Sequence, residues 1–246
     1  VIIPVYNAEN TIRKAVKSID TTHDVEIICI NDGSTDRTKQ VLTELQKEVK
    51  HLIVYHQDNQ GAAKSRNMGL SAMSDDIDAF MFLDADDQFL PGKMDQMIQY
   101  YEKNEHLDIV IGQIGRGLNG DWKVIPTHED IHREAIVSLA EAPEILQSIG
   151  PGGKLFKAKF NTLRFDEDVV FCEEHTFVTR AYLMARDIQL VPFIVYGYNE
   201  REGSITDQRA DTFISYLEDA RKVRREVMDM LLLVNEKAYY SYRMDD

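Results

Sequence analysis

The first 85 residues alternate short apolar runs with longer amphipathic ones, and this rhythm constrains the fold more than any other feature of the chain. The apolar runs are rich in β-branched or aromatic residues, which is typical of buried strands. They span residues 1–5, 25–30, 52–55 and 77–83. The segments between them carry apolar residues at three- and four-residue steps, which predicts helices. These segments are residues 8–20, 35–50 and 61–74. Such alternation predicts a parallel sheet with helices on both faces.

The pattern becomes less regular after residue 83. Helical periodicity and apolar runs still predict elements, with helices at 91–103, 172–186 and 211–240 and strands at 108–114 and 189–198. We therefore expect an α/β domain over residues 1–205, built on a mostly parallel central sheet with helices on both faces. Residues 206–246 are expected to form a C-terminal helical extension, packed on that domain or leading to a missing region.

Charge and cysteine content limit the classes of function. The chain has 28 Lys and Arg against 42 Asp and Glu, a net charge of −14, which disfavours a general nucleic-acid binder. A nucleotide site is not excluded, because a divalent cation can reverse the local charge. The two cysteines, Cys29 and Cys172, form no disulfide framework or metal-type cluster. Because no run approaches the roughly 18 apolar residues of a spanning helix, we expect a cytoplasmic protein.

Polar residues follow three of the predicted strands. In an open α/β sheet, ligands bind at the carboxyl ends of the strands, so these residues are candidates for a site. They lie at 4–7, 31–34 and 84–87. Ordinary turn chemistry also favours Asn, Asp and Gly at such positions, and for 31–34 alone the two interpretations are equally good.

Two carboxylates after the fourth strand are more demanding. Asp84 and Asp86 lie two residues apart, so on an extended segment both point the same way and can face one oxygen-seeking cation. Mg²⁺ or Mn²⁺ carrying a diphosphate would relieve their repulsion. The alternative is an acidic start to the helix near Pro91. No phosphate-binding glycine loop or dinucleotide fingerprint is present, which disfavours purine-nucleotide phosphotransfer and dinucleotide redox chemistry.

Four motifs in order resemble a known family. They are Val-Ile-Ile-Pro-Val-Tyr-Asn-Ala at 1–8, Asn-Asp-Gly-Ser-Thr-Asp at 31–36, Asn-Gln-Gly-Ala-Ala-Lys-Ser-Arg-Asn at 59–67 and Asp-Ala-Asp-Asp at 84–87. Together they resemble the family 2 inverting glycosyltransferases with the GT-A fold, a Rossmann-like architecture. The resemblance covers residues 1 to about 90, with weaker matches to about 205. It implies a nucleotide-diphosphate-sugar donor, most often UDP-linked, and a Mn²⁺ or Mg²⁺ ion.

The resemblance also implies roles for the residues that bind the donor. Pro4 and Tyr6 would line the base pocket, and Asp32 would accept a hydrogen bond from the uracil imide. Asn59 and Arg66 would frame the nucleotide. A carboxylate suits a base that presents an N–H group, because a buried base without that partner would be left unpaired. For Arg66 the alternative is a cation on a helix surface.

Metal and phosphate contacts are implied in the same way. Asp86 would be the direct metal ligand, and Asp84 would contact the ribose or the metal. Arg201 and Ser204 match an Arg-x-Gly-Ser-Ile segment of the family and would hold the phosphates. Lys154 matches a recurrent Lys-Leu-Phe element, and either a position in the acceptor cleft or packing of its stem on the core would explain it.

An acidic pair supplies the candidate general base. Inverting transfer is a single displacement in which the attacking hydroxyl must lose a proton. Family members carry the base in an acidic pair that opens a late helix, and Glu173 and Glu174 match it, with Glu174 where Asp is usual. We expect Glu174 to be the base. Glu173 and the neighbouring His175 are the alternatives, and an acidic pair also simply suits a helix start.

The sequence thus predicts a metal-dependent glycosyltransferase of the cell-wall or exopolysaccharide type. It would move a hexosyl or N-acetylhexosaminyl group to a hydroxyl of a glycan or polyol-phosphate polymer. A lipid-linked acceptor, peripheral association with the inner face of the membrane, and self-association all stay open. A sugar nucleotidyltransferase and a non-catalytic nucleotide-sugar or glycan-binding module are the alternative functions.

Overall fold

The N-terminal strands form a small parallel sheet. The computed structural model describes residues 1–118, 120–199 and 209–234. Strands β1 (Ile2–Val5), β2 (Ile27–Asp32) and β3 (Leu52–Gln57) pair in the order β1-β2-β3, all parallel. This part of the sheet confirms the expected strand–helix alternation, and it brings the carboxyl ends of β1 and β2 to the same edge.

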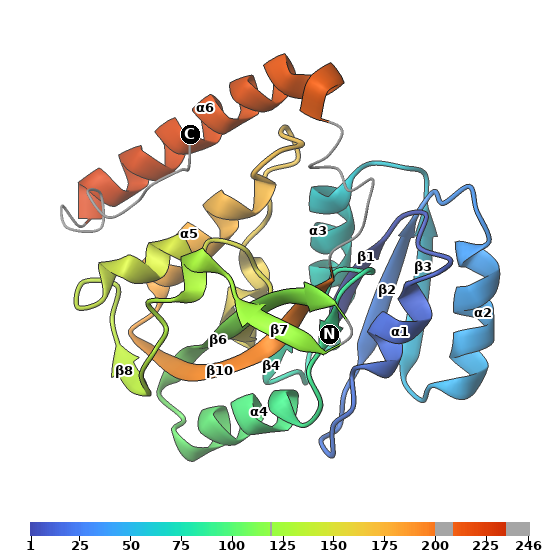
Figure 1. The fold of residues 1–246 in the computed structure, drawn as a ribbon, viewed down its shortest axis with the longest axis horizontal. Helices are drawn as coiled ribbons and strands as arrows, with labels where there is room; N and C mark the ends of the chain where they lie inside the picture. Colours follow the sequence, from blue (N-terminus) through green and yellow to red (C-terminus); the bar gives the residue numbers. More distant parts are fainter. Residues whose placement is uncertain (119, 200–208, 235–246) are drawn as a thin grey trace.

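Helices cover both faces of this sheet, as the alternation predicts (Figure 1). Helices α1 (Ile12–Lys17) and α2 (Thr38–Glu48) pack on one face, and α3 (Ala62–Ala72) packs on the other against β1 and β2. The first helix is shorter than the predicted 8–20. Its expected first turn is instead a loop held by α2, since the Ala8 N–H donates to Thr38 Oγ1 at 2.8 Å.

The second half of the chain forms a mixed sheet. Strands β4 (Ala79–Met81), β9 (Lys154–Lys157), β6 (Leu107–Leu118), β10 (Asp187–Asn199) and β5 (Gln88–Phe89) lie side by side in that order. Strand β7 (Asp121–Val124) pairs with β6, and β8 (Ala135–Val137) pairs with β10. Among the strand pairs of this sheet in the described part of the chain, only β6–β10 is parallel.

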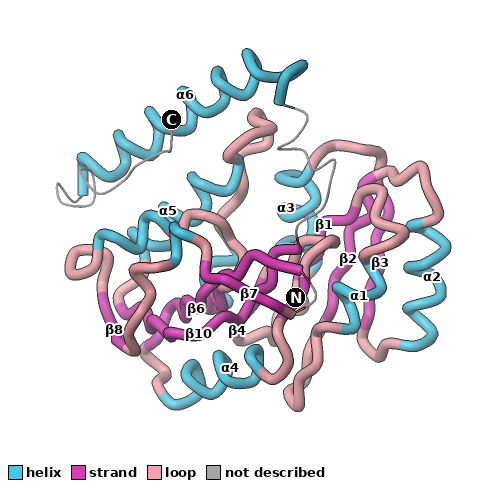
Figure 2. Tube along the Cα trace, in the orientation of Figure 1, coloured by secondary structure: helices cyan, strands magenta, loops and turns pink. Residues whose placement is uncertain are grey.

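The prediction of a mostly parallel sheet is therefore wrong for this half. Parallel neighbours need a crossover of a dozen or more residues, usually a helix, whereas antiparallel neighbours need only a turn or loop. Between β7 and β9 the chain is mostly loop (Figure 2), with β8 and two short 3₁₀ turns, η1 (Pro126–His128) and η2 (Pro143–Gln147). A third such turn, η3 (Ala158–Thr162), follows β9.

Backbone contacts join the two sheets edge to edge. Ile2 in β1 forms a parallel bridge with Phe82, just after β4, and the Leu83 N–H donates to the Ile2 carbonyl at 3.0 Å. The joined sheet carries a core on each face, because side chains alternate along the strands. Phe80 and Phe82 face α3 and α5 (Glu173–Met184), while Met81 and Leu83 face the side covered by α1, α2 and α4 (Lys93–Lys103). Each fully buried Phe contributes roughly 1.5–3 kcal/mol.

A long C-terminal helix lies over α5 (Figure 1). Helix α6 (Arg209–Val234) buries Val223, Val227 and Leu231 in the same core as α5. The described part of the predicted extension is thus helical and packed on the α/β body. Within the described residues, no helix is both long and apolar enough to cross a bilayer.

Candidate active site

Asp32 organises the carboxyl edge of the small sheet. It ends β2 and is almost completely buried, and its carboxylate accepts three hydrogen bonds. Gln57 Nε2 and the Gln60 N–H donate to Oδ1 at 2.7 and 2.8 Å, and the Gly61 N–H donates to Oδ2 at 2.8 Å. The last two donors belong to the start of α3, where a negative charge is favourable. Asp32 therefore fixes the loop that carries Asn59.

The ends of β1 and β2 are tied together beside it. Asn7 adopts a left-handed backbone (φ 46°), and its Oδ1 accepts a hydrogen bond from the Thr35 N–H at 2.8 Å. In return, the Asn7 N–H donates to Ser34 Oγ at 3.0 Å. Pro4 is half-buried within β1, whereas Tyr6 is 51% exposed just beyond its end. The edge thus presents an aromatic ring next to a fixed polar loop.

Gly33 permits a close approach that shapes the same edge. Its φ of 68° is left-handed, and a Cβ at this position would lie 2.6 Å from the backbone nitrogen of Asn59. Any side chain would push the two loops apart. Asn59 itself is exposed. Because the segments after β1, β2 and β3 contact one another in this way, the predicted donor-binding residues from three strands lie at one edge of the sheet.

The acidic loop after β4 is anchored through its third carboxylate. Asp87 is buried, and it accepts hydrogen bonds from the Tyr196 hydroxyl at 2.7 Å and the Asn199 N–H at 3.0 Å. Burial, followed by repulsion from Asp84 and Asp86, raises the pKa of Asp87 to about 8. The Tyr196 hydroxyl also accepts from the Asp84 N–H at 3.1 Å. Strand β10 therefore holds the loop that presents the first two carboxylates.

Arg66 joins this loop to the acidic pair of α5. It lies on α3, and its side chain is only 8% exposed. One guanidinium nitrogen donates to Asp84 Oδ1 at 2.9 Å, and another donates to Glu173 Oε1 at 2.7 Å. Burial opposes the charge, but Asp84, Glu173 and Glu174 outweigh it and raise the pKa of Arg66 further. The guanidinium also lies over the Phe165 ring, 5.4 Å from its centroid.

The acidic pair opens α5 behind a left-handed residue. Cys172 has φ 64°, and Glu173 and Glu174 are the first two helical residues, where the helix dipole favours negative charge. Burial and then the charge of Glu174 raise the pKa of Glu173 above its ordinary range, against the opposing effect of Arg66. Burial lowers the pKa of the neighbouring His175 to about 4, so its imidazole is neutral at neutral pH.

Lys154 belongs to a buried polar network. Its ammonium donates to Ser148 Oγ at 2.7 Å and to the Gly150 carbonyl at 2.5 Å, with the Gly152 carbonyl at 3.5 Å. His128 Nδ1 accepts from the Ile114 N–H, so its Nε2–H donates to Ser148 Oγ at 2.9 Å. Lys154 is fully buried, and of its two predicted locations this favours packing in the core.

Two features limit how a cation could be held. Among the described residues, no three His, Cys, Asp or Glu side chains are grouped so as to bind a metal by themselves. Asp84, 45% exposed and paired with Arg66, and the half-buried Asp86 are the two carboxylates predicted to hold the ion, and one or two carboxylates plus phosphate oxygens are a usual set for Mg²⁺. Arg201 and Ser204, predicted to contact the phosphates, lie outside the described residues.

Comparison with protein families decides the class of this site. Residues 1–171 match the model of glycosyl transferase family 2. The chain belongs to this family. A Staphylococcus aureus relative named as a glycosyltransferase, TagX, is 36% identical over 249 residues, covering all of this chain and 70% of TagX. Glycosyltransferase GlyA of Streptococcus pneumoniae is 30% identical over 261 residues, covering 99% of this chain and 36% of GlyA.

Solved structures agree on the fold of this family 2 member. A crystal structure of S. aureus TarS 1-349 superposes with a TM-score of 0.80 at 20% identity, over 98% of this chain and 69% of that one. Structures of TarS 1-349 in complex with UDP and with UDP-GlcNAc give TM-scores of 0.77 and 0.78. The expected architecture is thereby confirmed as an α/β fold matching TarS, with the mixed sheet as its correction.

The family 2 site contains residues that sequence reasoning left without a role. Asp87 was visible as the third acid of its motif, but its partner Tyr196 lies 109 positions away and had no local signal. The partnership of Arg66 with Glu173 was equally hidden, since the two are separated by 107 positions. The sequence indicates Glu173 as an alternative general base, whereas the structure pairs it with Arg66.

Proposed function

We propose that this family 2 enzyme transfers a sugar from a UDP-linked donor to a hydroxyl group of a glycan or polyol-phosphate polymer, with inversion at the anomeric carbon. The observation that carries the proposal is the Arg66 bridge between Asp84 and Glu173. One guanidinium donates both to the acidic loop implied in donor binding and to the acidic pair implied in proton removal. A single displacement needs these two functions close together.

Asp32 is proposed to recognise the uracil. A carboxylate has about four acceptor positions, and protein donors fill two on Oδ1 and one on Oδ2. One position on Oδ2 remains for the imide N–H of the base, and Pro4, Tyr6 and Asn59 are proposed to line the same pocket. The TarS complexes with UDP and UDP-GlcNAc support a UDP-sugar donor for this chain.

Asp86 and Asp84 are proposed to hold Mn²⁺ or Mg²⁺ together with the diphosphate. The donor set fits, because three aspartates crowd this loop: burial first, and then the charges of Asp84 and Asp86, raise the pKa of Asp87 to about 8, and a positive charge would relieve the repulsion. A bound divalent cation would stabilise the charge that develops on the departing diphosphate. Arg201 and Ser204 are proposed to contact the same phosphates.

Glu174 is proposed as the general base. Glu173 is committed to Arg66, so we assign proton removal to its neighbour. The acceptor oxygen forms the new bond to the anomeric carbon while the bond to the diphosphate oxygen breaks, and the hydroxyl proton passes to the Glu174 carboxylate. Arg66 donates hydrogen bonds to both Glu173 and Asp84, and it therefore holds the acidic pair close to the acidic loop.

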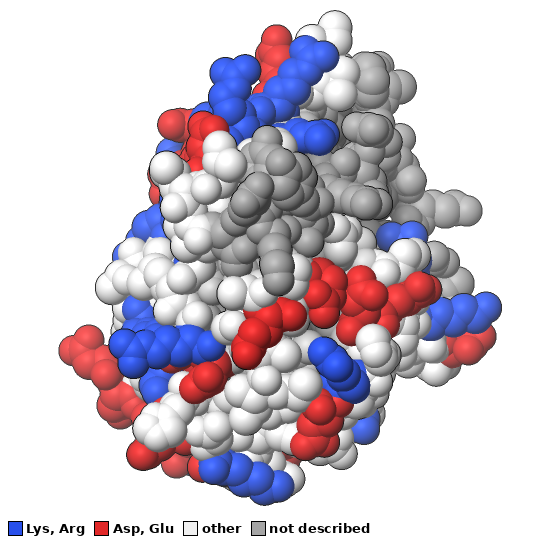
Figure 3. All heavy atoms as spheres, turned by 90° about the vertical axis from the view of Figure 1, so that its left-hand side faces the viewer, with Lys and Arg blue, Asp and Glu red and all other residues white. Residues whose placement is uncertain are grey.

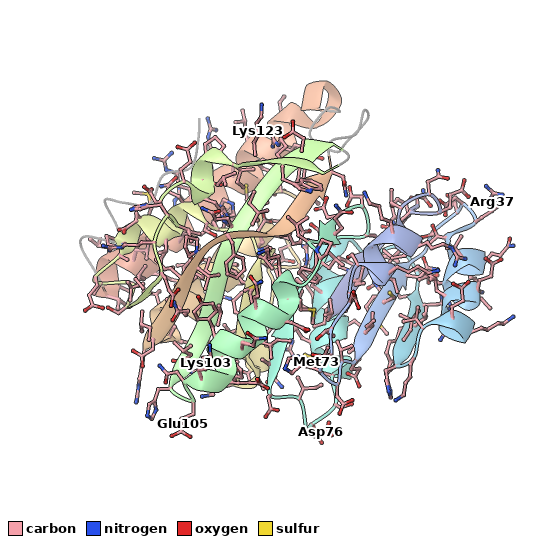
Figure 4. All side chains as sticks on the ribbon, turned by 60° about the horizontal axis from the view of Figure 1, so that its bottom comes forward. Arg37, Met73, Asp76, Lys103, Glu105 and Lys123 are labelled. Atoms are coloured by element: carbon pink, nitrogen blue, oxygen red, sulfur yellow. The ribbon has the colours of Figure 1, made fainter. Side chains whose placement is uncertain are left out.

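A panel of UDP-sugars tests the proposal. Only an intact catalytic centre should hydrolyse a donor slowly in the presence of Mn²⁺, whereas a binding module should bind the donor without cleaving it. Glu174→Gln should keep UDP affinity within about twofold and lose transfer by about 10²–10⁴-fold, the usual contribution of a general base. Glu105→Gln is the control, because this exposed glutamate lies at the periphery beyond α4 (Figure 4). Normal transfer by Glu174→Gln would move the assignment to Glu173 or His175.

The surface charge is compatible with a small anionic donor. On the face drawn in Figure 3, Lys and Arg side chains lie in separate groups between Asp and Glu. Nucleic-acid-binding proteins instead concentrate basic side chains into one patch or stripe.

We propose a cytoplasmic enzyme working at the inner face of the membrane. The acceptor screen should therefore include both polymer classes, each free and lipid-linked.

A further inference from the structure

Helix α6 contacts the segment that leads into the acidic pair. Three polar or aromatic side chains on α6, spaced three residues apart, face this segment: Tyr216, Asp219 and Lys222. Positions three apart lie on one side of a helix, so the three form a single stripe. The helix that follows the α/β body therefore touches the loop from which α5 begins.

Asp219 makes the contacts closest to the acidic pair. Its Oδ2 accepts hydrogen bonds from the Val170 N–H at 2.8 Å and the Phe171 N–H at 3.1 Å. The ring of Phe171 also stacks on Tyr216, with centroids 5.1 Å apart and planes 12° from parallel. Hydrogen bonds to a charged acceptor are about twice as strong as neutral ones. Two backbone positions immediately before Cys172 are thus fixed from α6.

The same loop is held at its other end. Lys222 forms an ion pair with Asp166 at 3.1 Å. On the opposite side, the Asn67 amide of α3 accepts from the Phe165 N–H at 2.8 Å. Val170, between these anchors, is 77% exposed, whereas Val169 and Cys172 are buried in the core beside α5, so Asp219 adds to an apolar anchorage of the turn.

The turn at Cys172 is conformationally strained, so contacts from α6 help to hold its shape. Cys172 adopts a left-handed conformation that costs a residue with a side chain about 1 kcal/mol or more. It directly precedes Glu173 and Glu174, so its backbone angles set the direction in which α5 starts and both carboxylates project. A small rotation here would move the carboxylates by the distances that matter for proton transfer.

We propose that Asp219 is a positioning residue for the acidic pair, acting through the Val170–Phe171 backbone. The inference rests on the proposed function, because it assumes that Glu174 removes the acceptor proton. Asp219 holds the geometry of the transfer step and takes no part in binding the donor, whose proposed contacts lie on β1, β2, the loop before α3, helix α3, the loop after β4 and residues 201–204. Helix α6 is docked independently of it by Val223, Val227 and Leu231.

The test compares Asp219→Ala with Asp219→Asn in the whole chain. The alanine variant loses both hydrogen bonds, whereas asparagine keeps an oxygen that can accept them. We expect kcat for transfer to fall about 10–100-fold in Asp219→Ala, the range expected for a misplacement of about 1 Å, with donor KM and UDP affinity unchanged. Asp219→Asn should recover most of the rate.

Glu226→Gln provides the matched control. Glu226 lies on the same helix and pairs with Arg180 of α5 at 2.6 Å, but it does not touch the loop. Its loss should lower the melting temperature slightly and leave kcat unchanged. The inference is overturned if Asp219→Ala keeps kcat within twofold of the wild type, or if kcat and UDP affinity fall together.

Two further outcomes keep the test decisive. If Asp219→Ala does not fold, Asp219→Leu, which fills a similar volume without an acceptor oxygen, takes its place and should lower kcat without changing donor KM; an unchanged kcat overturns the inference. The base assignment is tested separately by Glu174→Gln. Normal transfer in that variant removes Glu174 from the mechanism and with it the premise of this inference, whereas a lost transfer step with a silent Asp219→Ala rejects only the inference.

Discussion

Two groups of carboxylates, at opposite ends of the site, are stabilised in different ways. Asp32 accepts three hydrogen bonds from neutral donors, two of them at the start of a helix. Asp84, Asp87 and Glu173 instead lie among other acids, and burial and mutual repulsion raise the pKa of Asp87 and of Glu173. The first carboxylate is held by the fold alone. In the second group, Asp84 and Glu173 depend on Arg66, and Asp87 depends on the Tyr196 hydroxyl and the Asn199 N–H. In our proposal, a cation brought with the donor adds to these partners.

Of the variants considered, the removal of Arg66 should change the free energy of unfolding most. Arg66→Met leaves Glu173 buried beside Glu174 without its positive partner, and breaking a buried ion pair from one side costs about 3–5 kcal/mol. We expect a loss of that size in the free energy of unfolding, measured by urea titration, together with loss of transfer. Adding Glu173→Gln should recover part of the stability. A variant within about 1 kcal/mol of the wild type would show that the bridge is dispensable.

Asp86→Asn tests whether the acidic loop, unlike Asp32, depends on a cation. If the acidic loop holds the metal with the diphosphate, this variant should lose about 10²-fold in UDP affinity measured with Mn²⁺, or about 2.7 kcal/mol. Affinity measured without metal should change little. Asp76→Asn is the control, since Asp76 lies at the edge of the molecule in the loop before β4 (Figure 4). Unchanged metal-dependent binding would remove Asp86 from the metal site.

Lys154 extends the comparison to a buried cation. Lys154→Met leaves the Gly150 carbonyl without its donor, so we expect a loss of about 1–3 kcal/mol in unfolding free energy. Burial lowers the pKa of Lys154 from the ordinary 10.5 to about 7. Between these values the unfolded chain binds a proton that the folded chain lacks, so this residue's contribution to stability rises with pH. Its contribution is constant below about pH 7.

The wild type and Lys154→Met should therefore be compared by denaturant titration at several pH values. The stability advantage of the wild type should grow as the pH rises from about 7 towards 10. A constant difference across this range would mean that the ammonium stays charged among its carbonyl and hydroxyl acceptors, with a pKa near its ordinary value.

Asp32→Ala should have a smaller effect on donor affinity than Asp86→Asn. The hydrogen bond to the uracil would be lost, so UDP binding should weaken about tenfold, or about 1.4 kcal/mol. The variant also loses the three hydrogen bonds that fix the loop of Asn59, so its melting temperature should be measured alongside. Calorimetry with UDP and CDP sharpens the prediction, because cytosine lacks the imide N–H. The wild type should prefer UDP, and the variant should lose that preference. Equal binding of UDP and CDP by the wild type would contradict the role given to Asp32.

The sequence predicted the first half of the fold well because its signals are local. Apolar runs and helical periodicity placed the three parallel strands and located Asp32 and Asp84 at strand ends. The second half depends on pairings between distant segments, such as β6 with β10, and no local pattern reveals whether these run parallel. The same limit hid the contacts that organise the site, since Tyr196 and Asp219 act on residues about 50 to 112 positions away.

The backbone pairing between β1 and the segment after β4 restricts how the two halves of the molecule can move. Because Ile2 pairs with Phe82 in a parallel bridge and its carbonyl accepts a hydrogen bond from the Leu83 N–H inside the core, hinging the two halves apart at this edge would break these contacts. Accommodation of sugars or acceptors of different size must then come from the loops beyond the strand ends. Exchanging those loops between relatives should alter which sugars or acceptors bind, while the sheets and helices beneath them keep their stability.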